Sequence, residues 1–115
     1  MTVVGIGARS GVTAGEVLAA VDAVLPAGAR VTALATLDVR AAEPGLAAAA
    51  AARGWPLTVY SAAELAPVMV PSSSDRVAAH VGTGSVAEAS ALVDGGRLVV
   101  PKTVHGRVTV ALAVP

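Results

Sequence analysis

A glycine-rich loop near the N-terminus is the first segment whose residue types could bind an anion. The loop joins an apolar, β-branched run to a predicted helix, and its glycines let backbone amides approach a negative charge. The helix start adds partial positive charge, and Arg9 could donate two hydrogen bonds to a carboxylate or a phosphate. We therefore predict a ligand-binding role for five loop residues, which are Gly7, Arg9, Ser10, Gly11 and Thr13.

The same loop permits two other interpretations. Dinucleotide-binding folds carry the pattern G-x-G-x-x-G, and here the third glycine, Gly11, comes one position later than that pattern requires. Asp38 stands at the end of the second predicted strand, where an acid would bind a ribose, so a dinucleotide-binding half-domain stays an alternative. The glycines could also serve a tight turn alone, with Arg9 in solvent.

Three carboxylates could act as general bases or orient a water molecule, and we take Asp38, Glu43 and Glu88 as candidate catalytic residues. Asp38 and Glu43 lie on either side of Arg40, just after the second predicted strand. Arg40 is a candidate ligand-binding residue. It could equally form a surface ion pair with Asp38, worth about 1 kcal/mol or less.

A second glycine loop, at residues 82–84, precedes another predicted helix and forms a second candidate anion site with Thr83 and Ser85. Ser85 and Glu88 also have the spacing of a capping box, so they could simply satisfy backbone amides at the helix start. The same spacing occurs at two other predicted helix starts, where we favour capping: Thr13 with Glu16, and Ser61 with Glu64.

Lys102 is the only lysine of the chain, since the other basic residues are all arginines. It directly follows a predicted strand, and its ammonium group is a compact charge that arginine does not duplicate. We predict that Lys102 binds ligand, with a chance placement as the alternative.

Apolar runs alternate with helical patterns along the chain. Strands are predicted over 2–7, 31–37, 57–60, 97–100 and 107–114, with helices ending before Pro26 and over 44–53, 61–65 and 85–93. Apolar strands buried on both sides by helices are typical of α/β proteins. We therefore predict one domain over residues 1–115, a three-layer α/β/α sandwich. Its sheet is mixed and mainly parallel, with about five strands and an antiparallel last pair.

Parallel strands would bring several polar residues to one edge of this sheet. Arg9, Arg40 and the pair Tyr60–Ser61 all follow the carboxyl end of a predicted strand, and Lys102 is a further candidate for the same edge. Open α/β sheets bind their ligands in the crevice at that edge. An edge with several cations suits a ligand that carries several negative charges.

The composition excludes several classes of protein. Hydrophobic residues make up 55% of the chain, which excludes disorder, and eight acidic residues balance eight basic ones, so we expect no nucleic-acid partner. Without cysteine there is no disulfide, zinc finger or thiol nucleophile. Neither His80 nor His105 has metal-ligand spacing to another ligand, so we expect no metal site. No signal peptide or membrane span is visible, and we expect a cytoplasmic protein without a membrane partner.

The order of these motifs resembles the CobE family of cobalamin biosynthesis, whose domain also forms the C-terminal part of CbiG. The matching segments are residues 4–7 with Arg9 and Gly11, 35–38, 43–46, 61–65, 82–89, 100–102 and 108–111. Together they cover nearly the whole chain. Two positions depart from the family pattern: Ala8 stands where the family often has Cys, and Arg40 where it often has Lys.

This resemblance implies a role in the corrin-ring part of cobalamin synthesis. The implied partner is a precorrin or corrinoid intermediate, with other enzymes of the pathway as further candidates. CbiG opens a lactone ring on a cobalt-precorrin and releases acetaldehyde, so a hydrolase of the cobalt-precorrin-5A lactone is an alternative function. The chain has no counterpart of the CbiG N-terminal region and resembles the stand-alone CobE form. The resemblance supplies no catalytic residues, and we expect no cofactor.

Overall fold

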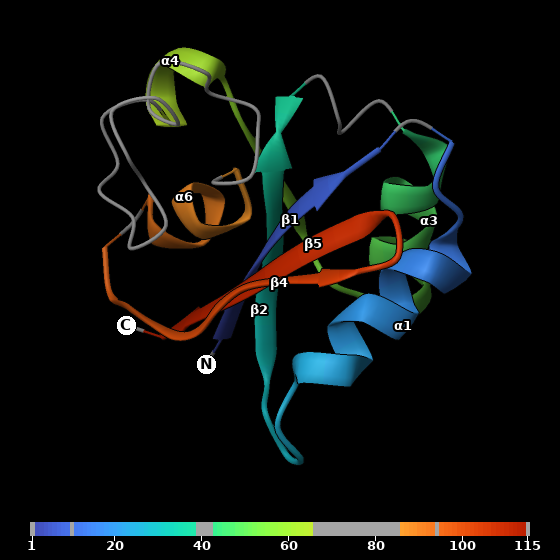
Figure 1. Cartoon of the computed structure of the whole chain (residues 1–115), viewed down its shortest axis with the longest axis horizontal. Coiled ribbons are helices and arrows are strands. Elements are labelled where there is room, and N and C mark those ends of the chain that lie inside the picture. Colours follow the sequence, from blue (N-terminus) through green and yellow to red (C-terminus); the bar gives the residue numbers. More distant parts are fainter. Residues whose placement is uncertain (1, 10, 39–42, 66–85, 94, 115) are drawn as a thin grey trace.

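The computed structural model describes residues 2–9, 11–38, 43–65, 86–93 and 95–114, which form a five-stranded sheet with helices on both faces (Figure 1). The strands are β1 (Thr2–Ala8), β2 (Val31–Leu37), β3 (Leu57–Tyr60), β4 (Arg97–His105) and β5 (Val108–Val114). The helices are α1 (Ala14–Val24), α3 (Pro44–Arg53), α4 (Ala62–Leu65) and α6 (Val86–Leu92). Because α1 and α3 cover one face and α4 and α6 lie on the other, the predicted α/β sandwich is confirmed (Figure 1).

The sheet is mixed, with the strand order β3-β2-β1-β5-β4. The pairs β1–β2 and β2–β3 are parallel, whereas β1–β5 and β4–β5 are antiparallel, as predicted for the last two strands. The carboxyl ends of β1, β2 and β3 therefore lie together, and we call this end of the sheet the carboxyl edge. Since β5 runs against β1, its first residue, Val108, lies beside Ala8 at the same edge.

Strand β4 is longer than predicted, because it continues past Val100 to His105. Pro101 lacks a backbone N–H and would interrupt a central strand, but an edge strand tolerates it at an irregularity. The pairing of β4 with β5 does shift register between Val100 and Thr103. Lys102 thus lies inside an edge strand, and the expectation that it follows a strand is wrong.

The two faces of the sheet differ in the size of their side chains. Alternation along the strands places bulky, fully buried residues on the side of α1 and α3: Val4, Ile6, Leu34, Val110 and Leu112. Most of the neighbouring positions, which point toward α6, are small: Gly5, Gly7, Ala35, Ala111 and Ala113. Leu37 is a larger residue on this side and packs with Val86 and Ala89 of α6. One face therefore holds the main apolar core, and the other lets a helix lie close to the strands.

Two glycines mark the points where helices come closest to other backbone. A Cβ atom on Gly5 would overlap the carbonyl oxygen of Ala87 and would lie 2.9 Å from the amide nitrogen of Ala91, so α6 rests directly on β1. A Cβ atom on Gly45 would overlap the carbonyl oxygen of Val12. The first turn of α3 is thereby packed against the loop that leads into α1.

Candidate functional site

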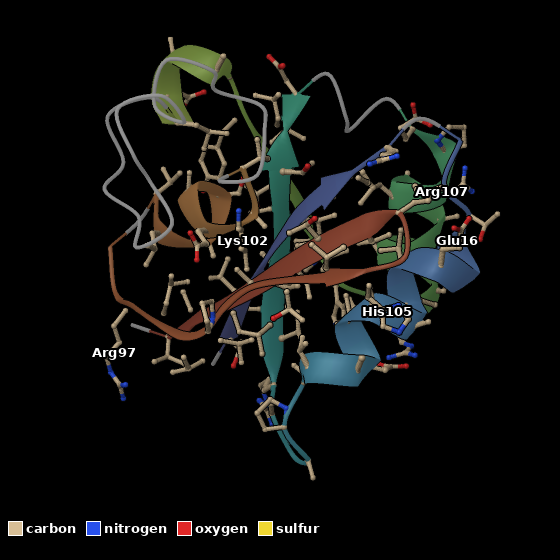
Figure 2. All side chains as sticks on the ribbon, in the orientation of Figure 1. Glu16, Arg97, Lys102, His105 and Arg107 are labelled. Carbon is tan, nitrogen blue, oxygen red and sulfur yellow. The ribbon has the colours of Figure 1, made fainter. Side chains whose placement is uncertain are left out.

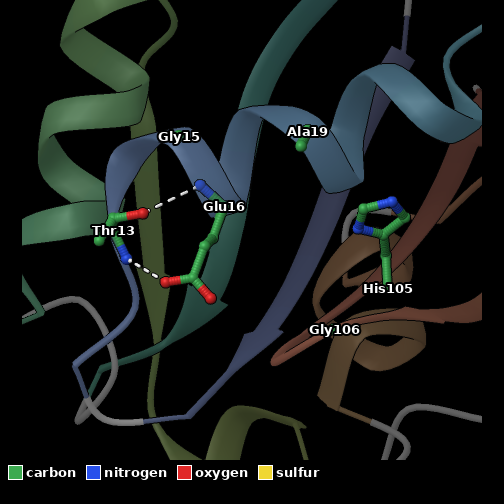
Figure 3. Close-up of a pocket in the computed structure, with 6 residues that line it drawn as sticks. All are labelled: Thr13, Gly15, Glu16, Ala19, His105 and Gly106. Atoms are coloured by element: carbon green, nitrogen blue, oxygen red, sulfur yellow. Dashed lines mark hydrogen bonds between the residues drawn. The ribbon is translucent and has the colours of Figure 1, made fainter.

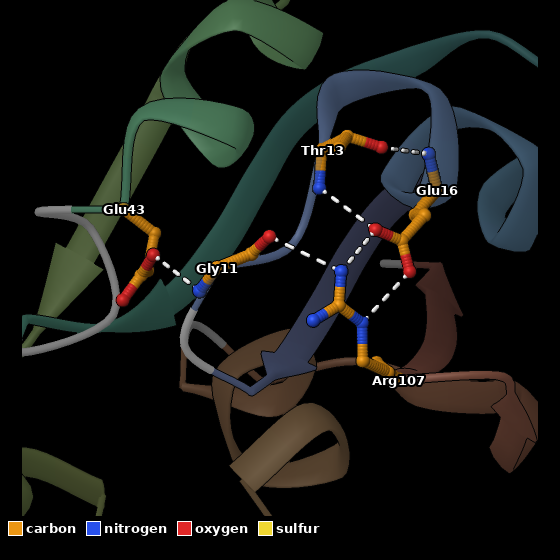
Figure 4. Close-up of polar contacts among 5 residues, drawn as sticks. All are labelled: Gly11, Thr13, Glu16, Glu43 and Arg107. Atoms are coloured by element: carbon orange, nitrogen blue, oxygen red, sulfur yellow. Dashed lines mark hydrogen bonds and ion pairs between the residues drawn. The ribbon is translucent and has the colours of Figure 1, made fainter.

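The loop between β1 and α1 ends in a capping box. The Thr13 hydroxyl oxygen accepts a hydrogen bond from the Glu16 N–H at 3.1 Å, and Oε1 of Glu16 accepts one from the Thr13 N–H at 3.1 Å (Figure 4). Ser61 and Glu64 form the same reciprocal pair before α4. Both predicted capping roles are confirmed. The amide of Thr13, proposed above as a ligand donor, is therefore occupied by a carboxylate of the chain itself.

Arg107 holds the same loop from the turn just before β5. Its Nε donates to Oε2 of Glu16 at 2.9 Å, its Nη2 donates to Oε1 of Glu16, and Nη2 also donates to the carbonyl oxygen of Gly11 at 3.1 Å (Figure 4). The hydrogen bond from Arg107, followed by that from the Thr13 N–H, lowers the pKa of Glu16 to about 2. No local sequence pattern joins Arg107 to Glu16, which is why the sequence did not indicate Arg107.

Glu43 completes this network from the residue before α3. Its Oε2 accepts a hydrogen bond from the Gly11 N–H at 3.0 Å (Figure 4). Gly11 has a φ of +82°, a left-handed conformation that suits glycine and points its amide toward Glu43. Glu43 thus holds the loop by a backbone hydrogen bond, a role that the sequence did not predict for this candidate catalytic carboxylate.

The loop amides therefore bind carboxylates, but these carboxylates belong to the same chain rather than to a ligand. The amides of Gly11 and Thr13 donate to Glu43 and Glu16 respectively. This arrangement supports the idea that the loop suits a negative group, and it leaves neither of these two amides available to a phosphate or to a carboxylate of a ligand. The dinucleotide interpretation gains no support from this geometry.

Arg9 is exposed at the carboxyl edge, directly after β1. Its backbone N–H donates to the carbonyl oxygen of Arg107 at 3.2 Å, which extends the pairing of β1 with β5 by one residue. Gly7, two residues earlier, lies beside Thr109 of β5 and close to Val86 at the start of α6. The described part of the loop thus offers one exposed cation next to the junction of β1, β5 and α6.

Glu88 is fully buried on α6 and holds the irregular part of β4. Its Oε2 accepts a hydrogen bond from the backbone N–H of Lys102 at 3.0 Å. The register shift around Lys102 removes this amide from the ladder with β5, and the carboxylate satisfies it instead. The side chain of Lys102 is exposed, and Figure 2 shows it on the α6 side of the molecule.

The structure separates the three candidate catalytic carboxylates. Asp38 is exposed just after β2, while Glu43 binds the Gly11 amide and Glu88 binds the Lys102 amide. Four predicted ligand-binding residues lie outside the described residues: Ser10, Arg40, Thr83 and Ser85. Of the predicted edge of cations, the described residues place Arg9 at the carboxyl edge. Lys102 lies inside β4, level with the middle of β1, so the expectation that it lies at that edge is wrong.

An open hollow of about 460 Å³ lies between the start of α1 and the turn that joins β4 to β5 (Figure 3). It is lined by Thr13, Gly15, Glu16, Ala19, His105 and Gly106. His105 extends from β4 toward α1, and the carboxylate of Glu16 is already bound by Arg107. In the described ranges, no three His, Asp or Glu side chains are grouped closely enough to hold a metal ion.

Comparison with known proteins identifies the family. The family described as "Cobalamin synthesis G C-terminus" matches residues 2–113. The chain belongs to this family. The resemblance indicated by the sequence motifs is confirmed, and the chain is a CobE-like member of a family of cobalamin biosynthesis.

Two curated relatives of this family member differ in length. Protein CobE from Sinorhizobium sp is 37% identical, and the match covers 98% of the chain and 79% of the relative. A cobalt-precorrin-5A hydrolase from Priestia megaterium is 29% identical, and the match covers 96% of the chain but only 31% of the hydrolase. The chain therefore spans about a third of the hydrolase.

Two crystal structures have the same architecture as this family member. One is CobE, a protein from the cobalamin (vitamin B12) biosynthetic pathway, with a TM-score of 0.77, 31% identity and coverage of 98% of this chain and 89% of that chain. The other is the cobalamin biosynthesis protein chiG from Agrobacterium tumefaciens str. C58, with a TM-score of 0.78, 40% identity and coverage of 99% of this chain and 98% of that chain.

Among the described residues, no helix has the length and apolar character needed to cross a membrane.

Proposed function

We propose that the chain binds a polycarboxylate intermediate of corrin-ring synthesis, a precorrin or corrinoid, at the carboxyl edge of the sheet. Membership in the family supports the pathway, and the general preference of open α/β sheets for binding ligands at this edge supports the location. The observation that carries the proposal is that two exposed cations are available to a ligand. Arg9 and Lys102 are exposed and form no ion pair with any described residue, whereas the nearby carboxylates of Glu16 and Glu43 are already held by the loop.

The spacing of the two cations favours a large ligand. Lys102 lies between the residues of β4 that pair with Val110 and Leu112, so it is level with Gly5 of β1. It is therefore about 13 Å from Arg9 along the strands and about 10 Å across them. The two side chains would bind separate carboxylates of one molecule, as a macrocycle with acidic groups around its rim requires. A protein that binds such an intermediate could then deliver it to another enzyme of the pathway.

The test is a titration of the chain with hydrogenobyrinic acid, followed by absorbance. We expect saturable spectral changes that weaken between about 0.05 M and about 0.5 M salt, because exposed charges are screened over a few ångströms at high ionic strength. Replacing Arg9 or Lys102 by Ala should each weaken binding by about threefold to tenfold, as expected for an exposed charge-assisted contact.

Arg30 and Arg97 supply matched controls. Both are exposed arginines at the opposite end of the sheet, where Arg30 precedes β2 and Arg97 begins β4 (Figure 2 shows Arg97). R30A and R97A remove the same charge as R9A and should leave the affinity nearly unchanged. Absence of binding, or equal losses in all of these variants, would contradict the proposed site.

Hydrolysis of the cobalt-precorrin-5A lactone is a second candidate function, because a relative carries that name and Asp38 lies exposed at the same edge. Glu43 and Glu88 are occupied with backbone amides, so Asp38 is the described carboxylate best able to activate water there. If the chain is the hydrolase, the lactone incubated with it should release acetaldehyde, and D38N should abolish the release. Aldehyde that forms only after another protein is added would exclude this activity.

A further inference from the structure

A small cavity lies between α6 and the sheet, and neither Arg9 nor Lys102 lines it. Its volume is about 90 Å³. The residues that line it come from β1, β3, α6, the turn after α6 and the end of β5: Val3, Tyr60, Ser90, Ala91, Gly95, Ala113 and Val114. The small side chains of Ala91 on α6 and Ala113 on β5 leave this space open between the helix and the sheet.

Ser90 gives the cavity a polar group without a partner. Ser90 is only 1% exposed, and within the described part of the chain its hydroxyl has no hydrogen-bond partner. A buried serine in a helix usually donates to the carbonyl oxygen four residues earlier, and Ser90 does not. An unsatisfied buried hydroxyl is unfavourable, so a guest that pairs with it would relieve that cost.

The lining residues restrict the chemistry of the guest. None of them carries a formal charge, which disfavours an ionic ligand, and most present methyl groups or backbone. An apolar cavity of about 150 Å³ holds benzene with its six carbon atoms, so about 90 Å³ corresponds to about four non-hydrogen atoms. Water alone needs two to four polar partners for each molecule, and Ser90 supplies a single unpartnered hydroxyl.

We propose that this cavity binds a small neutral carbonyl compound or alcohol of about four non-hydrogen atoms, with its oxygen hydrogen-bonded to Ser90. The Ser90 hydroxyl donates to the oxygen of a carbonyl guest, and the methyl groups of Ala91 and Ala113 contact its carbon atoms. This site is separate from the proposed corrinoid site, so either proposal can fail without the other.

Acetone is a suitable probe, because it has four non-hydrogen atoms and one acceptor oxygen. Titration of the full chain, followed by methyl ¹H–¹³C NMR, should shift the signals of Val3, Ala91, Ala113 and Val114 saturably in the millimolar range. S90A keeps the cavity and removes the donor, and it should weaken acetone binding at least fivefold. Pressurised xenon, which needs no hydrogen bond, should bind S90A and the unaltered chain alike.

A second variant keeps the test decisive. A113L should fill the cavity and abolish the acetone shifts, while A52L places the same substitution on an exposed position of α3 and should change nothing. If A113L fails to fold, S90A alone decides between the outcomes. The proposal is overturned if acetone gives no saturable shift, if S90A binds it equally well, or if NMR detects only bound water that acetone does not displace.

Discussion

The two faces of the sheet are built on different principles. On the side of α1 and α3, bulky aliphatic side chains such as Ile6 and Leu34 are completely buried and form the main core. On the side of α6, small residues bring a helix against the strands, and two polar side chains, Glu88 and Ser90, are buried with it. The first face stabilises the fold through apolar area, while the second places polar groups where water is excluded.

This contrast also explains where the site residues lie. The loop after β1 is fastened to the α1 and α3 side by Glu16, Glu43 and Arg107, so its polar groups are largely satisfied. Lys102 instead belongs to the α6 side, where Glu88 holds its backbone. The side chains offered to a ligand are therefore those that neither face uses for its own structure.

A substitution on the α6 face should cause the greatest loss of stability. Gly5→Ala should destabilise the protein by about 3 kcal/mol or more, because the new methyl group overlaps backbone atoms of α6 that cannot move independently. Gly7→Ala is the matched control on the same strand. Its Cβ would lie 3.8 Å from the Thr109 Cβ and 3.9 Å from that of Val86, which are ordinary contacts, so it should cost less than about 1 kcal/mol.

Urea denaturation followed by Trp55 fluorescence would measure both free energies of unfolding. Equal stability of the two variants would contradict close packing of α6 on β1, because the α6 face would then tolerate an added methyl group as a loosely packed surface does.

The next effect concerns the buried carboxylate. Glu88→Ala should cost about 2–3 kcal/mol, because it leaves a cavity and an unsatisfied Lys102 N–H. Glu88→Gln keeps an oxygen that can accept this hydrogen bond and should cost clearly less. Amide hydrogen exchange at Lys102 separates the two variants directly: we expect fast exchange in the alanine variant and slow exchange in the glutamine variant. Equal exchange in both would mean that the carboxylate does not hold β4.

Much of this fold could be predicted because its signals are local. The strand over Val31–Leu37 and the helix over Pro44–Arg53 have the predicted bounds, since apolar runs, proline and glycine act within a few residues. The capping boxes at Thr13 and Ser61 are equally local and are confirmed.

The contacts that define the site depend instead on tertiary structure. Glu43 meets Gly11 across 32 positions of the chain, and Arg107 meets Glu16 across 91, so no spacing rule indicates either pair. The strand predicted over 97–100 ended too early for a related reason: only the place of β4 at the edge of the sheet makes Pro101 acceptable within it. Sequence patterns predicted the helices, the strands and several candidate site residues, but they did not predict which residues those candidates would contact.

A weaker effect is expected on the α1 side, where exposed ion pairs hold the loop and the helices. The pKa of Glu16 is lowered from 4.5 to about 2, so its stabilising contribution is complete above about pH 4.5 and is lost as the pH falls toward 2. Glu16→Gln should therefore be less stable than the unaltered chain at pH 7, and this difference should shrink between pH 4.5 and pH 2. Asp22→Asn tests the other ion pair on this side, in which Arg53 lowers the pKa of Asp22.

Urea denaturation at a series of pH values would follow both variants. Because both ion pairs are exposed, added salt should reduce the difference at pH 7 as well. A stability difference for Glu16→Gln that stays constant down to pH 2 would show that the negative charge of Glu16 contributes nothing. Glu16 would then stabilise the protein only through the hydrogen bonds of its capping box. In that case Glu16 would hold its loop as Glu88 holds β4, by hydrogen bonds to backbone amides rather than by an ion pair.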